Sequence, residues 1–403
     1  TIADNEIVPS GQVAYNTASP VLFKSGQSLS HREALLSLMM NKRDAIMHQM
    51  DSLTKAEDAS EVDAVAPRKS SSSNSLTEGN QKVLCILIEF PDKSFTKSTS
   101  DFENMWNQHN YNIEGSQGSV NDFYTENSYG HMSVTATVVG PYMAKKNSTY
   151  YATGSNISGS HVRDLVKEAI TAAKSDIRFK DFDVNGDKYV DAIHVVFAGH
   201  CSESSGGDPT LIWSHHWQLS TSVLQGLYKA KEYFITPELA GSYGTRVAPM
   251  GTICHEYGHL LGAPDYYDGN HRYPGTGYWD LMGSGNWNGD GRCPAHHNPY
   301  TKAYIYNWVT PMVINSSVSN VTYTMTPSHN TTSIYRINTT TNNEFFLLEN
   351  KCAVPNSFNA EVPNPGGLLI YHVHSDIVNA INDALIKKGE GIYKKEINYL
   401  PNV

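Results

Sequence analysis

Charged residues are scarce in this chain of 403 residues, because Asp, Glu, Lys and Arg together make up only 17%. An average soluble protein has roughly 25%. Acidic residues outnumber basic ones by 40 to 30, which gives a formal net charge of −10. The basic residues form no block of the kind that binds a phosphate backbone, so we do not expect a nucleic acid as the partner.

Long apolar runs are also missing. No segment approaches the roughly 18 residues that a membrane-spanning helix needs, and the longest apolar stretches, 83–90 and 367–373, have the length of strands. We therefore expect no transmembrane segment. The chain begins without a charged and then apolar leader, so an export signal, if one existed, has been removed from this numbering.

Cysteine is rare, with five residues and none before Cys85. A chain of this length does not need a disulfide framework, and the usage of cysteine does not decide the compartment. Cys85 lies in an apolar run and is expected in the core. The first part of the chain cannot supply a cysteine thiolate to a metal.

The pattern of apolar residues divides the chain into three regions. Hydrophobic residues make up 39% of the chain, which is enough for a packed core. Residues 31–53 have the spacing of one helix face, and the polar stretch 55–81 is typical of a linker. The region 78–310 begins with the strand-like run KVLCILIEF and mixes strands with helices. Residues 311–403 contain short strands and form a smaller, mostly β unit.

The strongest local signal is HEYGHLLGAPD, which begins at His255. His255 and His259 are four residues apart and therefore lie on one helix face, about 40° apart. Glu256 can approach water at a metal there without being a ligand. Gly262 allows the left-handed conformation that ends a helix, so the chain can bring Asp265 back. Two imidazoles, a carboxylate and an open position suit catalytic zinc.

The alternative interpretation is an ordinary helix with two surface histidines. Composition alone would produce HExxH roughly 0.03 times in such a chain, and the added Gly and Asp lower the chance to about one in 8,000. We therefore favour the metal site.

The stretch HEYGHLLGAPDYYD, followed by GYWDLMGSGNW, resembles the immune inhibitor A family of secreted bacterial zinc metallopeptidases, within the metzincin clan. The similarity covers roughly residues 82–380 and includes GSVNDFYTENSYGHMSVTATVVGPY, DFDVNGDKYVDAIHVVFAGH, IWSHHW and EFFLLENK. It implies an α+β fold. A metzincin-like zinc protease domain, with a mixed twisted sheet and an active-site helix, would precede a smaller C-terminal, mostly β domain.

The resemblance also implies roles for individual residues. In that family two His and an Asp hold zinc and the Glu is the catalytic base, which corresponds to His255, His259, Asp265 and Glu256. The implied reaction hydrolyses peptide bonds of extracellular proteins, with metal-bound water as the nucleophile and Glu256 as the general base. Met282, in WDLMGSG, matches the Met-turn of the clan; its alternative role is simply to fill the core.

The group that stabilises the oxyanion is not assigned by this resemblance. Some metzincins place a Tyr two residues after the Met, where this chain has Ser284. The candidates that are near in sequence are Tyr266, Tyr267, Tyr278, His296 and His297.

A second, calcium-type cluster occurs in DVNGDKYVD. Hard cations bind oxygen ligands, and the EF-hand spacing is broken because Lys188 and His194 replace the expected Gly and Glu. The alternative is an Asx-turn that leads into a strand starting near Tyr189. The residues with side-chain oxygens, at loop positions 1, 3, 5 and 9, are Asp183, Asn185, Asp187 and Asp191.

The resemblance further implies bacterial-type export to the cell surface or the medium, with protein or peptide substrates. Residues 1–77 would be a pro-segment that is cleaved near Arg68-Lys69, or else a helical appendage. Two other functions stay open: a catalytically silent surface binding or adhesion protein on a protease-like scaffold, and a zinc hydrolase of non-peptide bonds. The oligomeric state is open.

Overall fold

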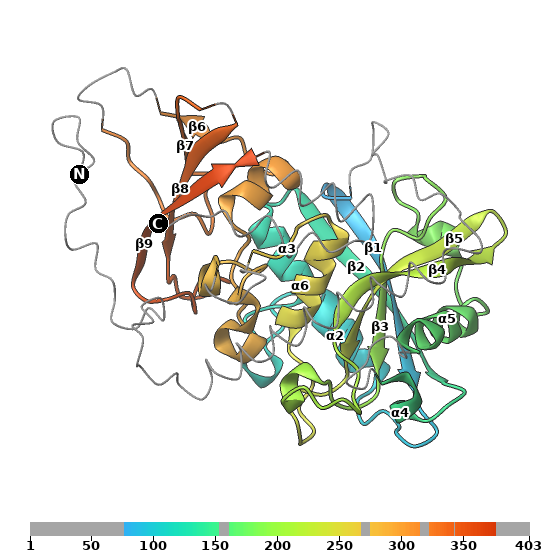
Figure 1. The fold of residues 1–403 in the computed structure, drawn as a ribbon. Coiled ribbons are helices and arrows are strands. Elements are labelled where there is room, and N and C mark those ends of the chain that lie inside the picture. Colours follow the sequence, from blue (N-terminus) through green and yellow to red (C-terminus); the bar gives the residue numbers. More distant parts are fainter. Residues whose placement is uncertain (1–75, 153–160, 267–274, 315–321, 342, 376–403) are drawn as a thin grey trace.

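The computed structural model describes residues 76–152, 161–266, 275–314, 322–341 and 343–375. The helix expected over 31–53, the cleavage point at Arg68-Lys69 and Tyr267 lie outside these residues. The fold contains both helices and strands and has two sheets, so the prediction of a mixed α and β architecture is confirmed (Figure 1).

The larger sheet has five strands in the order β2-β1-β3-β5-β4. Strands β2, β1, β3 and β5 run parallel to one another, and the edge strand β4 is antiparallel to β5. Their bounds are Gly79–Glu89 for β1, Met132–Met143 for β2, Ile193–Phe197 for β3, His215–Gln225 for β4 and Tyr228–Pro237 for β5.

Strand β1 is buried on both faces, as its continuous apolar run predicts for a central parallel strand. Val83, Cys85 and Leu87 pack on one side of the sheet, and Leu84 and Ile86 pack on the other. Cys85 is therefore a core residue, and all five cysteines are free thiols.

Two boundaries differ from the sequence prediction. Strand β1 begins at Gly79, ahead of the predicted run, because Gly79 pairs with Met132 of β2. Strand β3 begins only at Ile193 and not near Tyr189. The Asp191 carboxylate accepts the backbone N–H groups of Val184 and Asn185, which folds the preceding residues into a loop.

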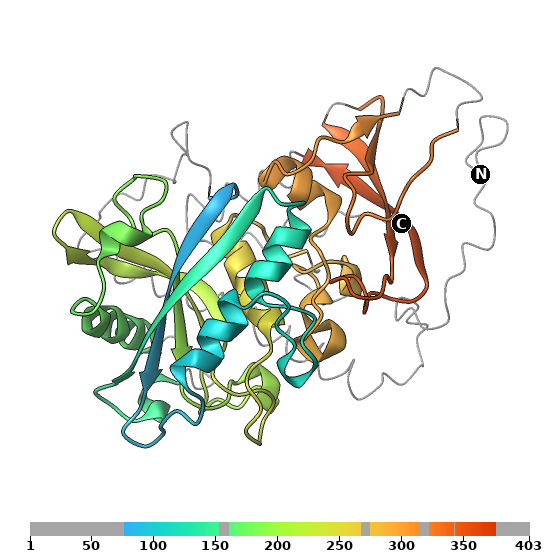
Figure 2. The same cartoon turned by 180° about the vertical axis from the view of Figure 1, so that it is seen from behind.

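Helices cover both faces of the large sheet (Figures 1 and 2). The helix α5, Val162–Ala173, buries its apolar face against one side. The helices α2, α3 and α6 lie on the other side and span Thr99–Asn107, Val120–Asn127 and Met250–Leu260. Within the described residues, no helix is long and apolar enough to span a membrane.

Short helical segments connect these layers. Their bounds are Ile113–Gly115 for η1, Ser148–Tyr151 for α4, Phe179–Phe182 for η3, Glu203–Ser205 for η4, Gly277–Trp279 for η5, Gly285–Gly291 for η6 and Thr301–Ile305 for the π-helical η7.

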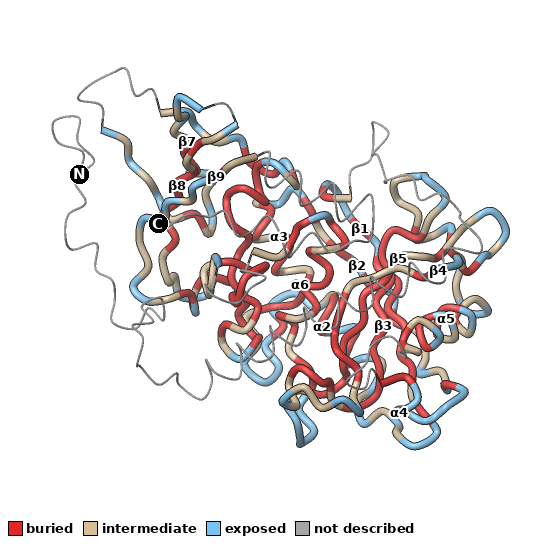
Figure 3. Tube along the Cα trace, in the orientation of Figure 1, coloured by how far each residue is buried: buried red, intermediate tan, exposed pale blue. Residues whose placement is uncertain are grey.

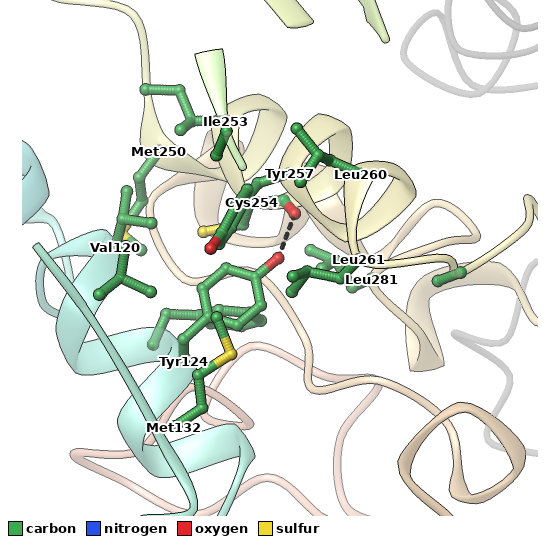
Figure 4. Close-up of a cluster of buried hydrophobic side chains, with 14 of the residues drawn as sticks. Val120, Tyr124, Met132, Met250, Ile253, Cys254, Tyr257, Leu260, Leu261 and Leu281 are labelled. Carbon is green, nitrogen blue, oxygen red and sulfur yellow. Dashed lines mark hydrogen bonds between the residues drawn. The ribbon is translucent and has the colours of Figure 1, made fainter. Parts of the chain in front are cut away.

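The helix α6 is buried on nearly all sides, and the buried part of the chain gathers around it and β3 (Figure 3). Its apolar side chains meet α3, as Figure 4 shows. The Tyr124 hydroxyl donates to the Cys254 carbonyl over 2.7 Å, and the Tyr124 and Tyr257 rings meet edge to face at 5.0 Å. This packing fixes the position of α6 on the sheet.

The smaller sheet has the order β6-β7-β8-β9 and lies beyond α3 and α6 (Figure 1). The short strands predicted within 311–403 are present and include β9 at the apolar stretch 367–373. The inward side chains Ile334, Phe345, Leu347 and Val373 belong to the same buried cluster as α3 and α6. The bounds are Met312–Val313 for β6, Ile334–Asn338 for β7, Glu344–Cys352 for β8 and Gly366–His374 for β9.

Candidate metal centre

Three of the predicted site residues meet at the C-terminal end of α6. The Nε2 atoms of His255 and His259 lie 3.1 Å and 3.3 Å from Oδ1 of Asp265. The two imidazole rings, one turn apart on the helix, are 4.8 Å apart between centroids and nearly perpendicular. One potential ligand atom from each residue lies within 4.8 Å of the others.

A tight turn after α6 produces this convergence. Gly262 adopts φ of 106°, a region that glycine enters without a Cβ penalty. The backbone N–H groups of Gly262 and Ala263 donate to the carbonyls of His259 and Gly258 over 2.9 and 3.0 Å. The turn at Leu261 and Gly262 thus returns Asp265 to the face that carries the two histidines.

Backbone carbonyls orient both imidazoles. The Nδ1 of His255 donates to the Leu281 carbonyl over 2.9 Å, and the Nδ1 of His259 donates to the Ala263 carbonyl over 2.8 Å. In neutral imidazole, a proton on Nδ1 makes Nε2 the lone-pair nitrogen. Neutral His255 and His259 would therefore each direct the Nε2 lone pair toward Asp265, with the backbone bond that metal-ligating histidines commonly make.

The donor set fits zinc. Bonds of about 2.0–2.1 Å in a tetrahedral site place neighbouring ligand atoms about 3.3 Å apart. The separations between nitrogen and carboxylate oxygen are 3.1 and 3.3 Å. Three atoms that each present a lone pair repel one another at this distance, unless a cation or added protons lie between them.

Comparison with known proteins places this site in a family. Residues 70–310 match the profile described as the catalytic domain of immune inhibitor A peptidase M6. The chain belongs to this family. The matched region contains α6 and all three converging residues, so the family resemblance seen in the sequence is confirmed, and with it the classification among hydrolases of the metalloprotease type.

Two relatives with curated descriptions share part of this region. Pre-pro-metalloprotease PrtV of Vibrio cholerae is 29% identical over 291 residues, which cover 58% of this chain and 30% of the relative. Immune inhibitor A of Bacillus thuringiensis subsp. alesti is 29% identical over 278 residues, which cover 55% of this chain and 39% of the relative. The matched part spans only about a third of these relatives.

Met282 lies buried beneath α6. A Cβ on Gly258, between the two histidines, would lie 2.9 Å from the Met282 sulfur and 3.2 Å from Cε1 of His297. Because Gly258 has no side chain, α6 of this peptidase can pack closely against the turn that contains Met282. Next to Met282, the Leu281 carbonyl accepts the His255 Nδ1–H, so this turn supports the site as well as filling the core.

The candidates for stabilising an oxyanion differ in how far their side chains are buried. His296 and His297 are 0% exposed, so neither can contact a substrate. The Tyr266 hydroxyl accepts a bond from the Thr301 hydroxyl over 3.0 Å, and burial raises the pKa of Tyr266 well above its usual value. Among the described candidates this leaves two tyrosines that are partly exposed, Tyr266 and Tyr278.

Two residues beside the site were missed by sequence reasoning. The His216 ring, on β4, lies 6.1 Å from the His259 ring and is nearly parallel to it. Its Nε2 lies 2.8 Å from Oε1 of Glu232 on β5. The segment IWSHHW agreed with the family, but no local spacing relates His216 to α6, because the contact depends on how the sheet and the helix pack.

In the predicted calcium loop, Asp183, Asp187 and Asp191 come together, with one carboxylate oxygen of each within 4.8 Å of the others. The same loop contains Asx-type bonds: the Asn185 Oδ1 accepts the Asp187 N–H over 2.9 Å, and the Asp187 Oδ1 accepts the Tyr189 N–H over 2.8 Å. The loop therefore contains both the clustered carboxylates of the calcium interpretation and the bonds of an Asx-turn, although the strand that follows begins only at Ile193.

Proposed function

We propose that this chain is a zinc-dependent endopeptidase that hydrolyses peptide bonds of extracellular proteins. The observation that carries the proposal is the convergence of the Nε2 atoms of His255 and His259 on the Asp265 carboxylate. It occurs within the region that matches the catalytic domain of a peptidase family. The fold would then be metzincin-like, with α6 as the active-site helix and Met282 as its Met-turn.

The metal and Glu256 would have separate roles in the proposed hydrolysis. When bound, zinc would supply Lewis-acid chemistry, which polarises the scissile carbonyl and acidifies water. Glu256 follows His255 on α6 and is 2% exposed. Its carboxylate would accept the proton of the attacking water and pass that proton to the leaving amine. The buried setting excludes bulk water from this transfer.

The edge strand β4 supports an extended peptide as the substrate. It pairs with β5 on one side, and within the described part of the chain no strand pairs with its other side. A peptide can add to such an edge through backbone hydrogen bonds. His216 places this strand beside His259, so an added peptide would pass close to the metal centre.

We also propose that the protein is secreted or displayed on the cell surface, and that residues 1–77 are a pro-segment. The relative PrtV is named a pre-pro-metalloprotease, which describes a precursor. The silent binding protein is the competing function. The presence of Glu256 together with all three ligand candidates favours the enzyme.

Digestion of casein tests the proposal. The zinc-loaded protein is expected to cleave casein at internal bonds, removal of zinc with a chelator should abolish cleavage, and added zinc should restore it. Fragments are separated by electrophoresis and their ends identified by mass spectrometry. Cleavage that persists after complete removal of zinc contradicts the zinc mechanism, and a zinc-loaded protein that never cleaves supports the silent binding protein.

The calcium site also remains a proposal, supported by the three carboxylates around Asp183. Calcium at 100 times its Kd would stabilise the folded state by about 2.7 kcal/mol, which raises Tm by several degrees. The melting temperature of the zinc-loaded protein is compared with and without calcium, and Asp187→Asn is the loop variant expected to lose the effect. An unchanged Tm in the wild type would mean that the loop does not bind calcium.

A further inference from the structure

A buried lysine of the smaller sheet reaches the support of the metal centre. Lys351, on β8, is 0% exposed. Its Nζ donates to the backbone carbonyl of His296 over 3.0 Å and lies 3.6 Å from the Glu349 carboxylate. Residues 344–352 lie beyond the region that matches the catalytic domain, which ends at residue 310.

The segment that Lys351 holds is bonded to the turn beneath α6. The Asp280 carboxylate accepts the backbone N–H and the side-chain amide of Asn298 over 3.0 and 2.8 Å. The Leu281 N–H donates to the His296 carbonyl over 3.4 Å, so this carbonyl accepts from both Leu281 and Lys351. The Leu281 carbonyl in turn accepts the Nδ1–H of His255.

The position of Lys351 is itself fixed. Glu349, also buried on β8, accepts hydrogen bonds of 2.7 Å from the hydroxyls of Ser328 and Tyr371. An ammonium group buried at this depth is costly unless it is paired and hydrogen-bonded, and Glu349 and the His296 carbonyl meet this need. The lysine therefore has little freedom to move away from the His296 carbonyl.

We propose that Lys351 is a positioning residue of the metal centre, which acts through the His296 and Leu281 carbonyls on the orientation of the His255 imidazole. The inference rests on the proposed metal site. It means that the smaller sheet is part of the structure that holds the ligands, although the family match ends before it. Loss of the Nζ donor leaves the His296 carbonyl without its bond from β8, and the turn at Leu281 can then shift.

The test compares zinc binding by the full chain and by three variants. Lys351→Met keeps the length and the apolar stem but removes the donor, and Lys351→Arg keeps a cationic donor. Leu347→Ala is the matched control, because Leu347 is equally buried on β8 but no hydrogen bond connects its side chain to the turn. Zinc Kd is measured by competition with a chromophoric chelator, and circular dichroism and Tm report the fold.

Lys351→Met is expected to weaken zinc binding by about 10-fold, the lower end of the cost of losing a direct partner of a metal ligand, because Lys351 acts through the His296 carbonyl and Leu281. Its cobalt-substituted form should show shifted visible absorption bands, because the ligand geometry changes. Lys351→Arg should retain the wild-type bands and bind zinc within about fivefold of wild type. Leu347→Ala should lower Tm but leave the zinc Kd and the cobalt spectrum nearly unchanged.

Three results would overturn the inference: wild-type affinity and spectrum in folded Lys351→Met, an equal loss of affinity in Leu347→Ala, or a clear loss in folded Lys351→Arg. The arginine variant keeps the test decisive if the methionine variant does not fold. If the wild type itself binds no zinc, the proposed metal site is wrong and this inference falls with it. If the wild type binds zinc and Lys351→Met is unaffected, only this inference fails.

Discussion

Replacement of Glu256 by glutamine is expected to lower kcat for peptide hydrolysis by about a thousandfold or more, while the zinc content stays at the wild-type level. Glutamine has nearly the same shape as glutamate but cannot accept the proton of the attacking water. General-base catalysis typically contributes 10²–10⁴-fold, and a thousandfold loss corresponds to about 4 kcal/mol in the activation barrier. Zinc should stay because Glu256 is not one of the three converging residues.

Steady-state kinetics on a fluorogenic peptide, with zinc measured by mass spectrometry, would check this expectation. Glu232→Gln is the matched control, because Glu232 is a partly exposed carboxylate that contacts His216 beside the site. It should keep kcat within about tenfold of wild type. Near-normal turnover by a zinc-loaded Glu256→Gln enzyme would contradict the proposed role of Glu256.

Replacement of His259 by alanine is expected to weaken zinc binding by well over a hundredfold and to abolish hydrolysis at ordinary zinc concentrations. Loss of a residue that is hydrogen-bonded to a metal ligand already lowers metal affinity 10–100-fold. This change removes a ligand itself. The remaining imidazole and carboxylate leave two of four tetrahedral positions to solvent, which is an incomplete site for zinc. The overall fold should persist, because the His259 side chain is partly exposed and α6 packs through other residues.

The control for this change is His216→Ala, which removes a neighbouring imidazole 6.1 Å from the His259 ring. Zinc affinity is measured by competition with a chelator for both variants and for the wild type. We expect a large loss of zinc affinity for His259→Ala and little change for His216→Ala. Equal losses in the two variants would mean that His216, and not the predicted set alone, holds the metal.

Local patterns in the sequence were sufficient to predict the helix and the turn that form the site. The spacing of His255 and His259 on one helix face and the stop at Gly262 are properties of consecutive residues, and the structure shows the same helix and turn. The short strands β8 and β9 of the C-terminal region were likewise visible as short apolar runs.

Features that depend on distant pairing could not be predicted in this way. The late start of β3 follows from a loop in which Asp191 binds the backbone of Val184 and Asn185. The approach of His216 to His259 requires the pairing of β4 with β5 and the packing of α6 on that sheet. The bond from Lys351 to the His296 carbonyl joins residues 55 positions apart, and no periodic pattern in the sequence relates them.

X-ray absorption at the zinc edge of the purified, zinc-loaded protein shows directly which kinds of atom bind the metal. We predict a first shell of about four nitrogen and oxygen atoms at about 2.0–2.1 Å, with the outer-shell scattering of two imidazoles and no sulfur. The imidazole scattering should fall in His259→Ala. A shell that contains sulfur, a shell without imidazole, or a spectrum that does not change in that variant would contradict binding by His255, His259 and Asp265.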